Sequence, residues 1–142
     1  MSHRLTAGLT DMNTSILAVA VAVVAAFVIS GVWYAAWGRS LERLHPAYAE
    51  GAPARPPAAT VLVEVVRNLA ITLVAVWLVS GMDVTDLAGG LGLGLALWVG
   101  FPVVILAGSV FHERVPAALA AIHAGDWLLK LLAICGLLAV WS

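Results

Sequence analysis

The feature that most constrains this chain is an apolar run near its end, from Pro116 to Trp141, that carries ionisable side chains in its middle. At about 1.5 Å of rise per residue, a helix of this length crosses a hydrocarbon core of roughly 30 Å. His123, Asp126 and Lys130 fall within a sector of roughly 60° and so share one face of that helix. Because a charged side chain at mid-membrane costs about 3 kcal/mol, we expect other segments to cover this face.

The composition is that of an integral membrane protein. Of the 142 residues, 63% are hydrophobic and 11% are charged, whereas a soluble domain is about 45–50% apolar and about 25% charged. The net charge of −1 offers no basic surface for nucleic acid. The single cysteine, Cys135, has no partner in the chain for a disulfide. We therefore expect the lipid bilayer as a partner, and no nucleic acid.

Four apolar segments predict four membrane spans, at about 14–38, 60–80, 87–111 and 116–141. The first is too long for a signal-peptide core, and Asn13 or Thr14 is its expected N-cap. The proline-rich segment 39–59 predicts a water-exposed loop, and Pro102 predicts a kink in the third span. The predicted fold class is all-α: residues 1–142 form one polytopic membrane domain, a compact bundle of four transmembrane helices.

The arginines predict how the chain is oriented in the membrane. Arg39, Arg43 and Arg55 lie in the first loop and Arg114 in the third, whereas the opposite side carries Arg4 and two aspartates. By the positive-inside rule, the first and third loops are cytoplasmic and both termini lie outside.

Small residues four apart on a helix predict where another backbone can approach closely. The chain has more of these small-residue faces than a single copy of four short helices needs for packing. We therefore expect a homo-oligomer or a larger membrane complex. The predicted helix-packing residues are Gly31 and Ala35, Gly90 and Gly94, and Ala121 and Gly125.

A second polar stripe lies on the second span and is predicted to meet the polar face of the fourth. Counted from the predicted cytoplasmic side, Arg67 lies roughly 10 Å deep and Asp126 roughly 15 Å. We therefore expect Asp126 to pair with Arg67 across the helices and with Lys130 along its own helix. Glu64 also has Arg67 three residues further along the second span, so that two acids and two bases balance. The predicted polar seam consists of Glu64, Arg67, Asn68, His123, Asp126 and Lys130.

Two interpretations of this seam remain open. His123, which titrates near neutral pH, and the carboxylate beside it could pass protons or coordinate a cation, so that the protein transports a small ion or solute. Alternatively, the ion pairs only set the register of the helices, and the protein is a structural or accessory membrane subunit. A water-filled cavity along the seam would favour transport, and a dry, fully paired seam would favour the accessory role.

The sequence carries no pattern typical of catalysis, a cofactor or a metal site. No nucleophile–base set or phosphate-binding loop is visible, and the glycines of 89–94 lie in a predicted membrane helix with no strand before it. His112 and His123 are eleven residues apart across a proline turn, which is not the spacing of metal ligands on one helix. We expect no enzymatic activity, no cofactor and no metal.

Three segments resemble one known family: GVWYAAWG at the end of the first span, LWVGFPV in the third, and FHERVPAALAAIHAGDWLLKLLAICGLLAVW at the end. They are similar to the bacterial and fungal membrane family catalogued as domain of unknown function 1761. The resemblance implies a compact four-helix membrane protein in which Gly31, Trp33, Tyr34 and the polar face of the last span recur. We expect the protein to lie in the bacterial inner membrane. It implies no activity. An aromatic residue or a histidine is expected where this chain has Asp126.

Overall fold

The computed structural model describes residues 2–52 and 56–141, with side chains described from Ser15 onward in these ranges. Its elements are α1 (Ser2–Leu44), the 3-10 turn η1 (Pro46–Tyr48), α2 (Pro57–Gly81), α3 (Leu87–Trp98), the π-helical turn η2 (Val99–Val103), α4 (Val104–His112) and α5 (Ala117–Trp141). Four stretches are long and apolar enough to cross a membrane: Ser15–Leu44, Pro57–Gly81, Leu87–His112 and Ala117–Trp141. The predicted all-α fold with four transmembrane helices is confirmed.

The first helix is longer at both ends than the sequence pattern predicts. It begins at Ser2, so Asn13 and Thr14 lie inside it, and the N-cap predicted there is wrong. At the other end it continues to Leu44, which shortens the predicted loop. No proline occurs before Pro46, so nothing in this segment removes a backbone hydrogen bond or clashes with the preceding turn.

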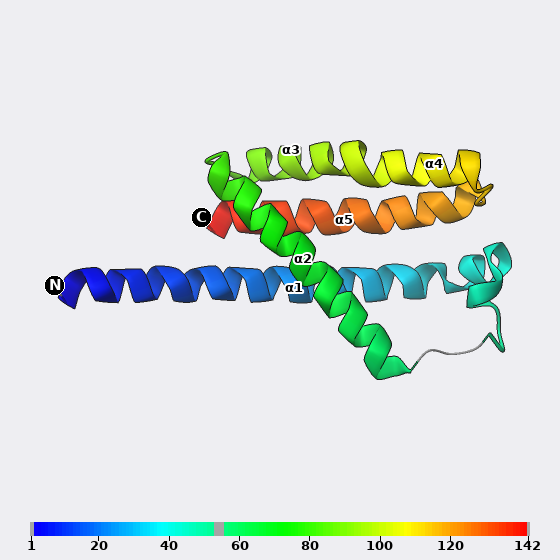
Figure 1. Cartoon of the computed structure of the whole chain (residues 1–142), viewed down its shortest axis with the longest axis horizontal. Helices are drawn as coiled ribbons and strands as arrows, with labels where there is room; N and C mark the ends of the chain where they lie inside the picture. The colour runs from blue at the N-terminus through cyan, green and yellow to red at the C-terminus, as the bar shows by residue number, and fades with distance from the viewer. Residues whose placement is uncertain (1, 53–55, 142) are drawn as a thin grey trace.

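Pro102 lies inside a helix that continues past it. At the position of the predicted kink the helix has a single π-helical turn, η2, in which Pro102 is buried. A π turn has a wider ring of backbone hydrogen bonds, which accommodates a residue that has no N–H to donate. In the view of Figure 1, α3, η2 and α4 form one continuous rod.

Helix α5 is the centre of the fold. It contacts α1, α2 and α3. Of its apolar stretch 44% is buried inside the protein, against 17–22% in the other three spans. In Figure 1, α3–α4 lies along one side of α5 and α1 along the other, while α2 crosses them obliquely. The polar face of α5 is thus covered by other helices, and α2 diverges from α3–α4 along part of its length.

Small residues bring α3 and α5 together. A Cβ added at Gly90 would lie 2.6 Å from the carbonyl oxygen of Cys135, and one added at Gly94 would lie 2.7 Å from that of Leu131. Both distances are shorter than any side chain tolerates, so the two glycines let the backbones of the helices touch. The predicted pair of Gly90 and Gly94 therefore packs within one chain, on α5.

The other predicted packing residues lie differently. Gly31 and Ala35 are exposed on α1, and among the described residues nothing lies within 4 Å of a Cβ added at Gly31. Ala121 is exposed as well, whereas a Cβ at Gly125 would collide with the indole ring of Trp33. Gly125 thus makes room for an aromatic side chain of α1, and the Gly31–Ala35 pair takes no part in packing within the described chain.

Candidate functional site: a polar seam and a lateral crevice

Polar side chains are buried where α1, α2 and α5 meet. Each of these three helices contributes at least one, and a polar group buried in a membrane protein needs a partner inside the protein. In the ranges that the structure describes, the buried polar and charged residues are Ser30, Asn68, Thr72, Asp126 and Lys130.

Asp126 uses both of its carboxylate oxygens inside the protein. Oδ1 accepts a hydrogen bond from Oγ of Ser30 at 2.6 Å, and Oδ2 lies 2.8 Å from Nζ of Lys130. Asp126 and Lys130 are each 2% exposed. Lys130 also places its Nζ 4.8 Å from the ring centroid of Trp127, a cation–π distance. The pair is therefore enclosed within the protein, and the Ser30 hydrogen bond joins α1 to α5.

Arg67 makes a different ion pair from the one that depth counting predicts. Its Nη1 lies 2.6 Å from Oε1 of Glu64, one turn earlier on α2, and its guanidinium carbon lies 5.8 Å from the ring centroid of Trp127. In the described chain Arg67 does not pair with Asp126, so the predicted bridge between them is wrong. Ser30 and Lys130 already occupy both oxygens of Asp126.

His123 bonds to an aromatic residue of α1. The hydroxyl of Tyr34 and Nδ1 of the half-buried His123 are 2.7 Å apart. One residue earlier on each helix, Nε1 of Trp33 donates to the carbonyl oxygen of Ile122 at 2.8 Å. His123 therefore belongs to a second set of α1–α5 contacts, next to Asp126 along α5.

Sequence reasoning missed the partners that α1 contributes. Ser30, Trp33 and Tyr34 lie three and four residues apart, which places them on one face of the helix. A hydroxyl on an otherwise apolar helix, followed by aromatic residues with polar atoms at that spacing, is the signal that could have found them. Their contacts with α5 make α1 the main partner of the polar face.

Asn68 is the one buried side chain in the described ranges whose polar atoms lack a hydrogen bond. The residue is 0% exposed, and neither its amide nitrogen nor its amide oxygen has a partner. Its backbone carbonyl accepts from Oγ1 of Thr72 at 2.8 Å. An unpaired buried amide is uncommon because it forgoes its hydrogen bonds to water without replacing them.

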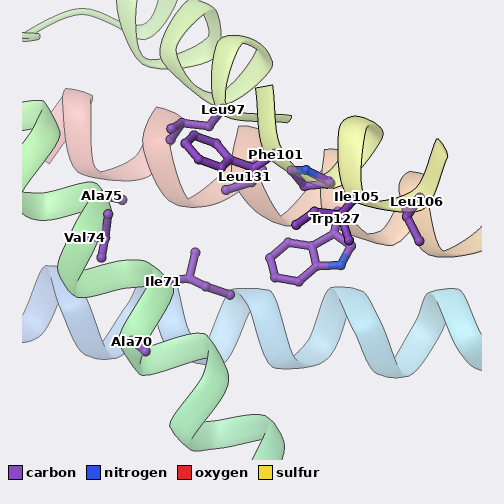
Figure 2. Close-up of a pocket in the computed structure, with 11 residues that line it drawn as sticks. Ala70, Ile71, Val74, Ala75, Leu97, Phe101, Ile105, Leu106, Trp127 and Leu131 are labelled. Carbon is purple, nitrogen blue, oxygen red and sulfur yellow. The ribbon is translucent and has the colours of Figure 1, made fainter. Parts of the chain in front are cut away.

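An apolar crevice of about 470 Å³ opens beside the seam, between α2 and α3–α4. We call it the lateral crevice. Figure 2 shows Ile71 of α2 and Trp127 of α5 pointing into it. Trp127 lines the crevice, and the guanidinium of Arg67 lies over its ring. The Glu64–Arg67 ion pair therefore lies at the edge of the lateral crevice. Its lining residues are Ala70, Ile71, Val74, Ala75, Leu97, Phe101, Pro102, Ile105, Leu106, Trp127 and Leu131.

A second groove, of about 540 Å³, lies between the predicted cytoplasmic ends of α1 and α5, where Trp33, Trp37 and Gly125 contribute to its lining. Within the described residues, no group of three histidine, cysteine, aspartate or glutamate side chains is placed to hold a metal ion. His112 is exposed at the end of α4 and contacts the ring of Phe111. The Asp126–Lys130 pair with its neighbours is thus the chemically distinctive part of the molecule.

Four apolar helices around a buried polar seam define a multi-pass membrane protein. The chain belongs to the family described as "Protein of unknown function (DUF1761)", whose sequence model matches residues 17–139. The family resemblance seen in the sequence is therefore confirmed. No curated protein and no solved structure matches the chain.

Proposed function

We propose that this protein is a structural or accessory membrane subunit that binds other transmembrane helices and does not transport ions or solutes. The observation that supports this proposal is the enclosure of the Asp126–Lys130 pair. Asp126 and Lys130 are each 2% exposed, and their contacts are with each other, Ser30 and Trp127. A conduction path needs such groups to face water or a cavity, whereas this arrangement holds helices in register.

The surfaces available to a partner are apolar. The lateral crevice and the groove between α1 and α5 are lined mainly by aliphatic and aromatic side chains. The Gly31–Ala35 pair adds a small-residue face on α1 where a backbone could approach. These surfaces suit a second membrane-embedded chain, as a homo-oligomer or within a larger complex.

Proton-coupled transport is the second candidate, and the unpaired amide of Asn68 favours it. A fully buried polar group without a partner is a place where a water molecule or an ion gains hydrogen bonds. The hydrogen bond between Tyr34 and His123 adds a titratable group beside Asp126. In this alternative, the seam opens to water in another conformation.

A flux measurement separates the two candidates. Purified protein is reconstituted into vesicles that contain a pH-sensitive dye, and a pH gradient or a K⁺ diffusion potential is imposed. The accessory role predicts that proton entry equals that of protein-free vesicles, for the wild type and for Asp126→Asn alike. Proton flux that the wild type supports and Asp126→Asn abolishes would establish the transport role instead.

The proposed location is the bacterial inner membrane, with both termini outside and the α1–α2 and α4–α5 connections in the cytoplasm. The arginines support this orientation, because Arg39 and Arg43 lie in the last turns of α1, near that end of the helix. We also propose that the protein has no enzymatic activity and binds no cofactor, since the sequence carries no catalytic motif.

A further inference from the structure

The Glu64–Arg67 ion pair lies at membrane depth but is not enclosed by the described chain. The guanidinium carbon of Arg67 is 5.8 Å from the ring centroid of Trp127. Trp127 is ten residues beyond Ala117, the start of α5, which is about 15 Å along that helix. Yet the side chain of Arg67 is 48% exposed and that of Glu64 is 29% exposed.

Lipid is a poor environment for such a pair. A charge at the bilayer centre is costly, and ionisable residues of transmembrane helices almost always face a protein interior or a water-filled cavity. The buried seam satisfies this rule for Asp126 and Lys130. For Glu64 and Arg67, which are partly exposed, a second surface supplied by another chain would satisfy the rule.

The Glu64–Arg67 ion pair lies next to the lateral crevice on the same face of α2. Ala70 and Val74 follow Arg67 at spacings of three and seven residues, so all three share one stripe of α2. Opposite them stand Phe101 and Ile105, which are 63% and 65% exposed. The surface therefore combines an apolar cleft with one acid and one base at its edge.

We propose that this surface, the lateral crevice with Glu64 and Arg67, is the interface between two copies of this chain. The inference rests on the proposed role as a helix-binding subunit and names its partner. A two-fold axis along the membrane normal places each residue at the same depth as its counterpart in the second copy. Glu64 and Arg67 are one helical turn apart. Each carboxylate can then reach the guanidinium of the second copy.

Charge complementarity favours a second copy over an anionic lipid. The acid and the base cancel, so the surface offers no net positive charge to a phosphate headgroup. A second copy necessarily brings a matching acid and base at the same depth. An isologous contact of this kind is closed, which limits the assembly to a dimer at this surface.

Charge reversal tests the proposed exchange across the interface. Glu64→Arg gives a surface with two bases, and Arg67→Glu gives one with two acids. Each variant should associate with itself about tenfold more weakly than the wild type, whereas the two variants co-expressed with different tags should co-purify in lipid nanodiscs at the wild-type level. Self-association of both variants at the wild-type level would overturn the proposal.

Cysteine crosslinking tests the same surface with the wild-type charges in place, and so does not depend on how the charge variants fold. The native Cys135 is buried, so an introduced cysteine is the accessible one. Val74→Cys should form a crosslinked dimer in native membranes, and Val28→Cys, which is on α1 and 54% exposed in the wild type, should not. A dimer that crosslinks at position 28 and not at position 74 would contradict the proposed interface but would leave the accessory role intact. Proton flux in the vesicle assay overturns the accessory role.

Discussion

Asp126 is held from two helices at once. Its carboxylate accepts from Ser30 of α1 and pairs with Lys130 of its own helix, and all three residues are buried. The mutual attraction of two buried charges offsets their desolvation only when the geometry is good and the remaining polar atoms are bonded. Removing one partner therefore costs more than removing both.

Asp126→Asn should lower the free energy of unfolding by about 3–5 kcal/mol, because it leaves the ammonium of Lys130 buried and unpaired. Adding Lys130→Met should recover part of that loss, since neither charge then remains. The matched control adds Arg67→Gln to Asp126→Asn, and these effects should add within about 0.5 kcal/mol because the two residues are not paired. Thermal unfolding in one detergent measures all the variants. Strong coupling to Arg67 with none to Lys130 would contradict the structure.

Tyr34→Phe should lower the free energy of unfolding by about 1 kcal/mol, because it removes the hydrogen bond to His123 and keeps the ring. Tyr48→Phe is the matched control: Tyr48 is exposed in η1, and its substitution should change nothing measurable. The same thermal unfolding assay reports both. Equal stabilities for Tyr34→Phe and the wild type would show that this bond contributes nothing.

At the scale of the helices, much could be predicted from the sequence. Apolar length predicts four spans, and the apolar run with polar residues in its middle predicts that α5 is covered. The bridge from Arg67 to Asp126 was predicted wrongly because depth counting assumes upright helices, whereas the i,i+3 spacing of Glu64 and Arg67 does indicate the pair that forms. Helix α2 crosses obliquely (Figure 1), and no periodicity within one helix encodes the angle to the next. Ser30 was missed because one hydroxyl in an apolar helix leaves its direction and partner open.

The contact between α3 and α5 depends on the absence of side chains at two positions. Gly90→Ala or Gly94→Ala should lower the free energy of unfolding by about 1–3 kcal/mol, since the new methyl group meets the backbone of α5. Gly92→Ala is the matched control, because nothing described lies within 4 Å of a Cβ there. It should be neutral or stabilising. Circular dichroism during heating compares the three, and equal losses at all of them would contradict this packing.

At the scale of the whole molecule, the orientation in the membrane can be tested directly. Ala47→Cys, in η1, should react with an impermeant thiol reagent only from the cytoplasmic side, because the arginine-rich connections are predicted to lie there. Met82→Cys, in the α2–α3 turn, should react only from outside. Intact cells and inverted membrane vesicles provide the two sides. The reverse pattern would invert the proposed topology.

The central claim is that water does not reach the buried polar side chains around Asp126, and the reactivity of a thiol among them measures this most directly. Ser30→Cys keeps the size of the residue that bonds to Asp126, and Cys135→Ala removes the native thiol. In lipid vesicles open to the reagent on both sides, a small charged thiol reagent should leave the cysteine at 30 unmodified for as long as Ala47→Cys takes to react completely. Modification of both at similar rates would show that water reaches the seam and would contradict the accessory role.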